Sequence, residues 1–174
     1  MRRKRNLLIL TLCLTGAVAY YVQLNFINVF FSIGENVPDL LLIVTVFVGG
    51  RLGQIPGSLY GFTAGLFQDA LIDFYGIHAL CKTVVGFAVK FFGMERVMLV
   101  EKYYFPVVVF ACAILHSVIF NSIQSLDGHA GFWALMLHYG LGNSVYSGLA
   151  ALVLRLALPA AWVEFIRYDV RYEY

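Results

Sequence analysis

The chain has 174 residues, of which 61% are hydrophobic and 13% charged, with a mean hydropathy of +0.81 and a formal net charge of +2. It holds more apolar surface than a soluble domain of this length can bury, which predicts a polytopic membrane protein with little extramembrane structure. The basic residues are few and spread in small groups along the chain, which argues against nucleic-acid binding.

The apolar runs predict about six transmembrane helices packed in one bundle, because a hydrocarbon core about 30 Å thick takes roughly 20 helical residues to cross. We expect a single all-α transmembrane domain over residues 1–174. The expected helices cover residues 7–31, 38–50, 55–68, 76–92, 103–123 and 132–158, and residues 159–174 form a cytoplasmic interfacial tail.

The chain starts with the basic group Met1–Arg5, and the uncharged stretch Asn6–Gly34 follows. Within that stretch, Ala17–Ala19 resembles a signal-peptidase site, and cleavage there would leave Tyr20 as the N-terminus. The apolar part runs longer than a signal peptide usually does, which favours a retained first helix.

The second expected helix starts at a turn that carries helix-start signals. We expect Asn36 or Val37 at the N-cap, Pro38 in the first turn and Asp39 near the positive end of the helix dipole. This helix and the next are short, so they either tilt and thin the bilayer or form a re-entrant pair.

The basic residues predict the orientation of the chain. With the N-terminus inside and six crossings, eleven of the twelve Lys and Arg residues fall on the cytoplasmic side, as the positive-inside rule requires, and both termini are cytoplasmic. Lys82, inside the fourth expected helix, is the exception. The cytoplasmic set is Arg2, Arg3, Lys4, Arg5, Arg51, Lys90, Arg96, Lys102, Arg155, Arg167 and Arg171.

Glycines recur at every fourth position from just before the third expected helix, at Gly53, Gly57, Gly61 and Gly65, and the series ends at Asp69. Four residues turn a helix by about 400°, so these positions share one slowly drifting face. Such a face lets another helix approach closely. The partner is either a helix of the same bundle or a helix of another protein.

Two carboxylates follow the glycines, at Asp69 and Asp73. They could act as an acid and base pair or a proton relay, but helix termination and loop hydrogen bonding account for them more simply. A cation at Lys82 is costly inside a membrane unless it is paired. We therefore expect Lys82 to bind Asp69 or Asp73 near the outer interface.

Polar side chains on the last two expected helices either hydrogen-bond between helices or line a substrate cavity. A second series of small residues lies on the last helix, at Gly140, Ser144 and Gly148. The polar set is His116, Asn121, Gln124, His138 and Asn143.

The sequence carries no enzyme, metal or cofactor signature, so we expect a protein that is not an enzyme and has no cofactor. The cysteines Cys13, Cys81 and Cys112 each lie in an apolar run, without the spacing of a disulfide framework or a zinc site. They are expected to be packing residues.

Several short motifs occur in order between residues 37 and 90: Pro38–Leu42, Gly57, Gly61–Phe62, Gly65-Leu66-x-x-Asp69 and Gly76–Leu80. Their order and spacing resemble the MreD family of bacterial rod-shape-determining membrane proteins. The length, the basic start and the six apolar segments agree with that family.

The resemblance implies a fold similar to the substrate-binding subunits of energy-coupling-factor transporters. It also implies a non-catalytic scaffold in the inner membrane that supports peptidoglycan synthesis and cell shape. The implied partners are MreC directly, RodA with a class B penicillin-binding protein, and MreB through MreC. The residues assigned to packing or partner docking are Pro38, Asp39, Gly57, Gly61, Gly65, Asp69 and Gly76, and Lys82 joins them as the unusual cation.

A vitamin-binding subunit of a membrane transporter is the alternative function, since the implied fold is shared and a bundle of short helices can enclose a ligand. The first helix argues against it, because Thr15, Gly16, Ala17 and Ala19 form no clear AxxxA motif for docking to a transporter scaffold.

Overall fold

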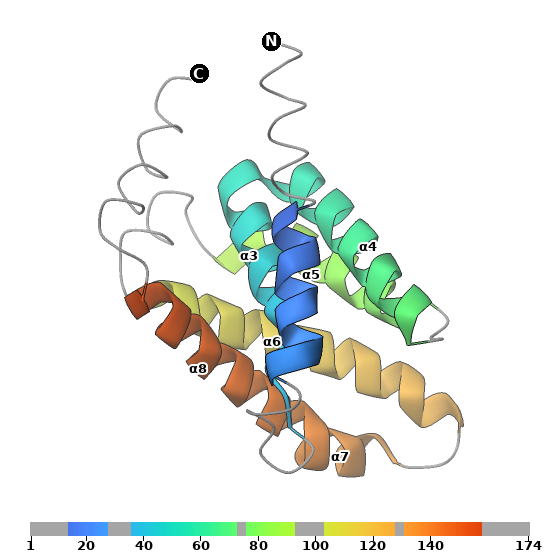
Figure 1. The fold of residues 1–174 in the computed structure, drawn as a ribbon. Helices are drawn as coiled ribbons and strands as arrows, with labels where there is room; N and C mark the ends of the chain where they lie inside the picture. Colours follow the sequence, from blue (N-terminus) through green and yellow to red (C-terminus); the bar gives the residue numbers. More distant parts are fainter. Residues whose placement is uncertain (1–13, 28–35, 73–75, 93–102, 128–130, 158–174) are drawn as a thin grey trace, which may run out of the picture.

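The computed structural model describes residues 14–27, 36–72, 76–92, 103–127 and 131–157, most of which form helices (Figure 1). The predicted all-α class is therefore confirmed. An N-terminal helix at residues 14–22 continues as the π-helix η1 (Gln23–Ile27). After it come α3 (Leu40–Leu52), α4 (Gln54–Leu71), α5 (Ile77–Phe92), α6 (Tyr104–Gln124), the 3-10 turn η2 (Ser125–Asp127), α7 (Phe132–Leu135), the π-helix η3 (Met136–Gly140) and α8 (Leu141–Ala157).

The observed helices follow the expected order, with shifted ends. The third helix continues to Leu71, three residues beyond its expected end, so Asp69 lies inside α4 and not after it. The last expected helix contains the π-helical segment η3 between α7 and α8. The expected segments 7–13, 28–31 and 158, and the tail 159–174, lie outside the described residues.

The start of α3 differs from the expected cap. Asp39 is the N-cap, and its Oδ1 accepts a hydrogen bond from the Leu42 N–H at 2.9 Å. The prediction of Asn36 or Val37 at the cap is wrong, and Pro38 precedes the helix. Asp is among the best N-cap residues because its short carboxylate reaches the orphan N–H groups of the first turn.

Two glycines have backbone conformations that other residues rarely adopt. Gly53 alone separates α3 from α4 and has a φ of 95°, and Gly76 immediately before α5 has a φ of 82°. Positive φ values cost a residue with a Cβ about 1–2 kcal/mol. The sharp reversal between α3 and α4 therefore depends on glycine at position 53.

The glycine series of α4 begins its close packing at Gly57. A Cβ added there would lie 2.5 Å from the Gly49 Cα of α3 and 2.5 Å from the Gly86 carbonyl oxygen of α5. Since real Cβ atoms essentially never come within 3.0 Å of another heavy atom, the three backbones meet only because glycine is present.

The next two glycines of the series contact α5 in the same way. A Cβ on Gly61 would overlap the Lys82 carbonyl oxygen, and a Cβ on Gly65 would lie 2.5 Å from the Ala79 Cα. Packing within the bundle is thus confirmed for Gly57, Gly61 and Gly65. A partner's helix has no room at this face, so the docking interpretation of these glycines is wrong.

The small residues of the last helix face α6. The Ser144 and Ser117 hydroxyl oxygens lie 3.2 Å apart, and a Cβ on Gly148 would lie 3.1 Å from the Phe110 Cβ. Figure 1 shows α6 and α8 side by side beneath the group formed by α3, α4 and α5. This second series therefore also packs inside the bundle.

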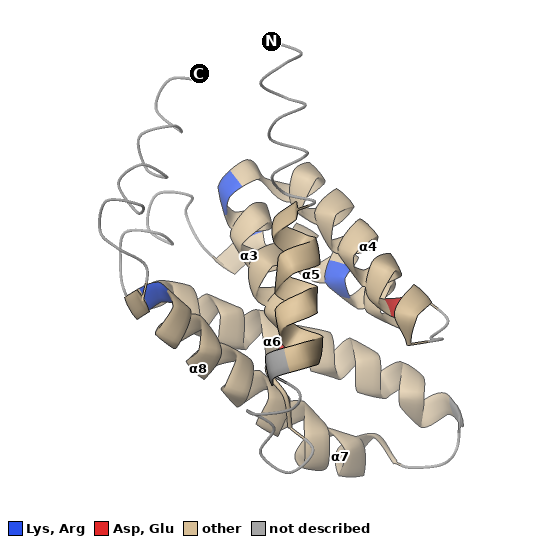
Figure 2. Cartoon of the chain, viewed as in Figure 1, with Lys and Arg blue, Asp and Glu red and all other residues tan. Residues whose placement is uncertain are grey.

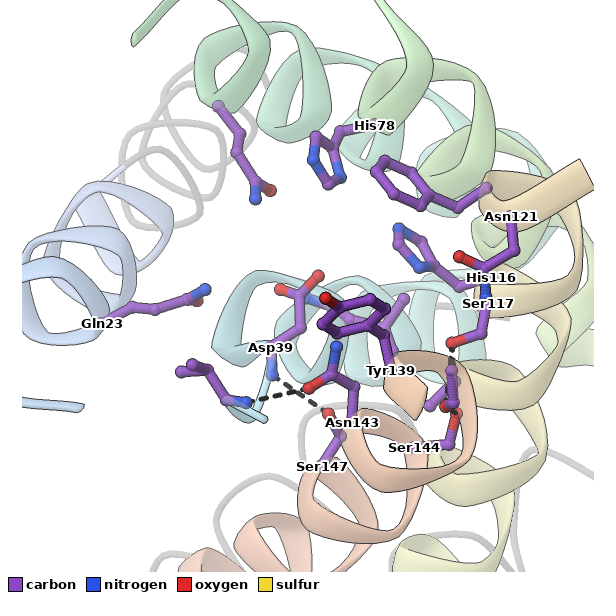
Figure 3. Close-up of a pocket in the computed structure, with 16 residues that line it drawn as sticks. Gln23, Asp39, His78, His116, Ser117, Asn121, Tyr139, Asn143, Ser144 and Ser147 are labelled. Carbon is purple, nitrogen blue, oxygen red and sulfur yellow. Dashed lines mark hydrogen bonds between the residues drawn. The ribbon is translucent and has the colours of Figure 1, made fainter. Parts of the chain in front are cut away.

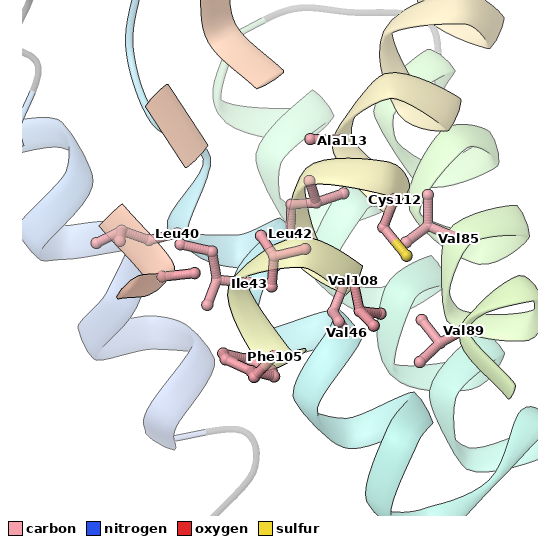
Figure 4. Packing of buried hydrophobic residues seen from close by; sticks show 12 residues of the cluster. Leu40, Leu42, Ile43, Val46, Val85, Val89, Phe105, Val108, Cys112 and Ala113 are labelled. Atoms are coloured by element: carbon pink, nitrogen blue, oxygen red, sulfur yellow. The ribbon is translucent and has the colours of Figure 1, made fainter. Parts of the chain in front are cut away.

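The hydrophobic core lies where α3, α5, α6 and α8 meet (Figure 4). Cys112 of α6 is fully buried in this cluster, and Cys81 of α5 is fully buried as well. The prediction that these cysteines are packing residues is confirmed, while Cys13 lies outside the described residues. The core residues include Leu42, Val46, Val85, Val89, Phe105, Val108 and Val109.

Besides the apolar core, the described helices bury several polar side chains and expose many large apolar ones. Lys82 and Thr45 are 0% exposed, whereas Ile55 and Phe91 are each 74% exposed. Figure 2 shows charged residues at only a few places along the ribbon. Water-soluble proteins show the opposite tendency, since charged residues are rarely buried in them. The distribution suits a bundle whose outer surface contacts lipid.

One described helix, α6, is long and apolar enough to cross a membrane by length and composition alone, with a mean hydropathy of 2.0. The apolar helix α3 has 13 residues, which extend about 20 Å at 1.5 Å per residue. The other crossings are expected from the distribution of apolar runs along the whole sequence, and the length and hydropathy of the individual described helices do not establish them.

Candidate functional site

Lys82 forms a buried ion pair. Its Nζ lies 2.5 Å from Asp39 Oδ2 and 2.8 Å from Gln68 Oε1. The expected pairing with Asp69 is wrong, because the Asp69 carboxylate instead binds backbone N–H groups; Asp73 lies outside the described residues. An ammonium group inside an apolar bundle requires such a partner, since an unpaired charge there is costly.

Asp39 connects three helices. One carboxylate oxygen caps α3, the other binds Lys82 of α5, and its backbone N–H donates to Ser147 Oγ of α8 at 3.0 Å. The pair therefore belongs to a wider polar network and is not an isolated contact.

Two amide side chains hold the segment next to Asp39. Val37 N–H donates to Asn143 Oδ1 at 2.8 Å, and Leu40 N–H donates to Gln23 Oε1 at 3.0 Å. The first amide comes from α8 and the second from the N-terminal helix. The start of α3 is thus fixed by side chains from both ends of the described chain.

Asp69, which lies in α4, caps the start of α5 with its side chain. Its Oδ1 accepts from the His78 N–H at 3.2 Å and its Oδ2 accepts from the Ala79 N–H at 2.8 Å. A carboxylate at the positive end of a helix satisfies orphan donors and complements the helix dipole. Asp69 therefore has a structural role, as expected, but its side chain caps helix α5 from within α4, so the expected hydrogen bonding to a loop is wrong.

We expect Asp69→Ala to destabilise the protein by about 1–2 kcal/mol, because two N–H groups at the start of α5, one buried and one partly buried, lose their acceptor. Thermal unfolding of the full-length protein in lipid nanodiscs measures the change. Asp69→Asn retains one acceptor oxygen and should lose less. Equal melting temperatures for the wild type and Asp69→Ala would contradict this assignment.

A cavity of about 240 Å³ lies beside the ion pair (Figure 3). Figure 3 shows Gln23, Asp39 and Tyr139 directed into the same space from different helices. We call it the polar cavity, because most of its described lining residues carry hydrogen-bonding groups. They are Gln23, Val37, Asp39, Leu42, Gln68, His78, Ala113, His116, Ser117, Phe120, Asn121, Tyr139, Gly140, Asn143, Ser144 and Ser147.

Two histidines and a phenylalanine stack along one wall of the polar cavity. The ring centroids of His78 and Phe120 are 4.8 Å apart, and those of His116 and Phe120 are 6.0 Å apart. His116 Nε2 is buried and has no hydrogen-bond partner among the described residues. A buried polar atom in this condition usually marks a place where water or a ligand binds.

The structure separates the predicted site residues into three groups. Asp39 lines the polar cavity, and Lys82 binds two of its lining side chains. Asp69 and Gly76 form the start of α5, and Pro38 is buried just before the cap of α3. The remaining candidates, Gly57, Gly61 and Gly65, pack α4 against α5 and lie away from the cavity lining.

The polar residues on the last two expected helices were expected either to hydrogen-bond between helices or to line a cavity, and each expectation holds for part of the set. His116, Asn121 and Asn143 line the polar cavity, whereas Gln124 and His138 are not among its lining residues. Gln23 and Gln68 were missed by the sequence analysis. A glutamine within an apolar helix is itself a signal, since polar residues at membrane depth face the bundle interior.

The lining offers hydrogen-bond donors and acceptors and one paired charge. Among the described residues, no group of three or more His, Cys, Asp or Glu side chains could hold a metal ion. The arrangement can hold a polar group within an apolar bundle, by hydrogen bonds on several sides.

The family comparison matches almost the whole chain. A family model described as rod shape-determining protein MreD matches residues 1–159. The chain belongs to the MreD family. The resemblance found in the motifs is therefore confirmed, and the match includes every helix described above.

MreD is a family of membrane proteins that determine rod shape, so this chain is a membrane protein with a role in rod-shape determination. The family is one of shape-determining structural membrane proteins and is not known as a family of enzymes. No curated protein and no solved structure matches the chain.

Proposed function

We propose that this MreD chain is a non-catalytic scaffold of the bacterial cell-elongation complex. It binds MreC, supports peptidoglycan synthesis by RodA and a class B penicillin-binding protein, and is connected to MreB through MreC. Family membership over residues 1–159 carries the proposal. The buried polar network supports it, because a bundle joined through Asp39 presents fixed outer surfaces to partners.

The scaffold is proposed to lie in the inner membrane as one domain of six crossings with both termini cytoplasmic, in a fold like that of energy-coupling-factor transporter subunits. The apolar exterior and buried polar interior of the described helices support membrane embedding. Arg51 in the last turn of α3 and Arg155 in the last turn of α8 support the orientation, since basic residues favour the cytoplasmic side.

The partner must contact a surface other than the glycine series, which α5 occupies. The outer faces of three helices provide similar apolar positions: Phe62 of α4 is 47% exposed, and Phe87 of α5 and Val145 of α8 are each 48% exposed. A single-span partner helix can pack against any one of these faces by van der Waals contact.

A photo-crosslinking residue placed singly at Phe62, Phe87 or Val145 tests the scaffold function. We expect a covalent adduct with MreC from one of these positions in living rod-shaped cells, because helix packing brings the partner within reach. Western blotting against MreC identifies the adduct. The buried Val109 of α6, which is 0% exposed, serves as the control position and should give none.

Failure of all three positions, together with absence of MreC from the natively purified protein, would contradict the scaffold proposal. An adduct from Val109 alone would show that the crosslink reports unfolded protein.

Localisation of the C-terminus by a fused reporter tests the orientation separately, and a periplasmic reporter would contradict it.

A second candidate function is small-molecule binding as a subunit of a membrane transporter. The polar cavity is the observation that favours it, because ligand sites are concave and have a few convergent polar groups. Recovery of a transporter scaffold in place of MreC in the same purification would support this candidate.

A further inference from the structure

Three amide side chains present hydrogen-bond donors at the lining of the polar cavity. The oxygens of Gln23 and Asn143 accept from backbone N–H groups, and the oxygen of Gln68 accepts from the Lys82 ammonium. These partners can only donate, so each amide must direct its oxygen toward them and its NH₂ group elsewhere. Among the described residues, none of the three NH₂ groups makes a hydrogen bond.

The same lining also includes a buried imidazole nitrogen, which donates or accepts a hydrogen bond according to its tautomer. His116 Nε2 is buried without a partner among the described residues, and Phe120 and Tyr139 make part of the wall aromatic. A ligand that both accepts and donates hydrogen bonds from one planar group, as a carboxamide does, can satisfy the amides and the imidazole together.

The charges at the polar cavity are already balanced. Asp39 is the acidic residue of the described lining, which includes no Lys or Arg, and its carboxylate binds Lys82 at 2.5 Å. An ion entering this site would add a charge without a counter-ion in apolar surroundings, which is costly. The site therefore favours an uncharged ligand.

The volume limits the size of the ligand. A cavity of about 240 Å³ corresponds to the liquid volume of about eight water molecules. It is smaller than the roughly 300–1,000 Å³ of sites that take drug-sized molecules. A single ring with one polar substituent is of the right order.

We propose that the polar cavity binds a small uncharged molecule that carries a planar ring and a carboxamide group, through the amide donors of Gln23, Gln68 and Asn143. The proposed binding assigns a ligand class to the polar cavity, which also favours the second candidate function. It does not rest on the scaffold function or on docking to a transporter, since capture of MreC, capture of a transporter scaffold and binding of a small molecule are separate measurements.

Three probes of similar shape and different charge test the proposal: nicotinamide is neutral, nicotinate is an anion and 1-methylnicotinamide, which carries one additional methyl group, is a cation. Binding to the full-length protein in lipid nanodiscs is measured by equilibrium dialysis. We expect saturable nicotinamide binding with a Kd below about 1 mM, and at least about tenfold weaker binding of both charged probes.

Gln23→Met is expected to weaken nicotinamide binding by at least about fivefold, because it removes the amide donor while keeping the side-chain length; it also removes the oxygen that accepts from the Leu40 N–H. Gln54→Met is the matched control and should bind as the wild type does, since Gln54 begins α4 and Gln68 lies about 21 Å further along that helix.

If Gln23→Met does not fold, Gln23→Glu keeps an oxygen for the Leu40 N–H and replaces the donor with a carboxylate. That variant should prefer 1-methylnicotinamide over nicotinamide. The proposal is overturned if nicotinamide shows no saturable binding, if nicotinate binds as well as nicotinamide, or if the folded Gln23 variants bind all three probes as the wild type does.

Discussion

Gly61→Leu should prevent accumulation of the folded protein. A Cβ at position 61 already overlaps the Lys82 carbonyl oxygen of α5 and would lie 3.1 Å from Thr45 Cγ2 of α3. Backbone atoms cannot turn aside as a flexible side chain can, so α4 and α5 must separate, at a cost above the usual 1–3 kcal/mol or so of an overpacked core. The measurement is the amount of full-length protein in the membrane fraction and its thermal unfolding in nanodiscs.

The matched control is Gly131→Leu. A Cβ on Gly131 meets nothing within 4 Å among the described residues, so the same change of side chain should leave abundance unchanged and lower the melting temperature far less than Gly61→Leu, the small loss coming from the N-cap position of Gly131 on α7. Normal abundance of Gly61→Leu, with loss of MreC alone, is the result that a docking face would give. That result would contradict the packing of α4 against α5 described above.

The glycine series shows what a sequence pattern can and cannot determine. A spacing of four predicts that Gly57, Gly61 and Gly65 share one helix face, and the structure confirms it. The same spacing suits an internal helix and a partner's helix equally well. Which of the two helices packs there is decided by α5, whose Gly86 lies opposite Gly57. The spacing of glycines within α4 does not show this contact, because it is a tertiary contact between two helices.

Local signals predicted the order of the helices well and the polar partners poorly. The length of an apolar run and the turn residues that flank it predict where a helix begins and ends, because these signals lie within or next to the helix itself. Lys82 and Asp39 are 43 residues apart, whereas the expected partner was Asp69 or Asp73 near the outer interface. Asp69 is instead occupied by the N–H groups that begin α5, a role that sequence distance alone does not reveal.

The polar cavity could be predicted only in part. His116 and Asn143 were recognised as polar residues in apolar helices, and lining a cavity was one of their two expected roles. Gln23 reaches the same space because η1 passes the start of α3, where its amide accepts from Leu40. Such a site gathers residues from several helices, so it follows from their packing and not from any one segment.

Lys82→Met should destabilise the protein by about 3–5 kcal/mol, because it leaves the Asp39 carboxylate without its cation inside the bundle. Asp39 keeps its cap on α3, but Gln68 loses the ammonium that its oxygen accepts from. Thermal or denaturant unfolding in nanodiscs measures the loss. Lys90→Met is the control, since Lys90 is an exposed residue in the last turn of the same helix.

The double variant Lys82→Met with Asp39→Asn distinguishes the effect of removing both charges from the effect of leaving one charge unpaired. Asn caps a helix about as well as Asp and can still accept from the Leu42 N–H, while neither charge remains buried. The double variant should therefore be more stable than Lys82→Met alone, since an unpaired buried charge costs more than the loss of the whole pair. Additive losses in the two single variants would mean that Asp39 and Lys82 do not depend on each other, and the ion pair would then have no part in fixing the start of α3 against α5.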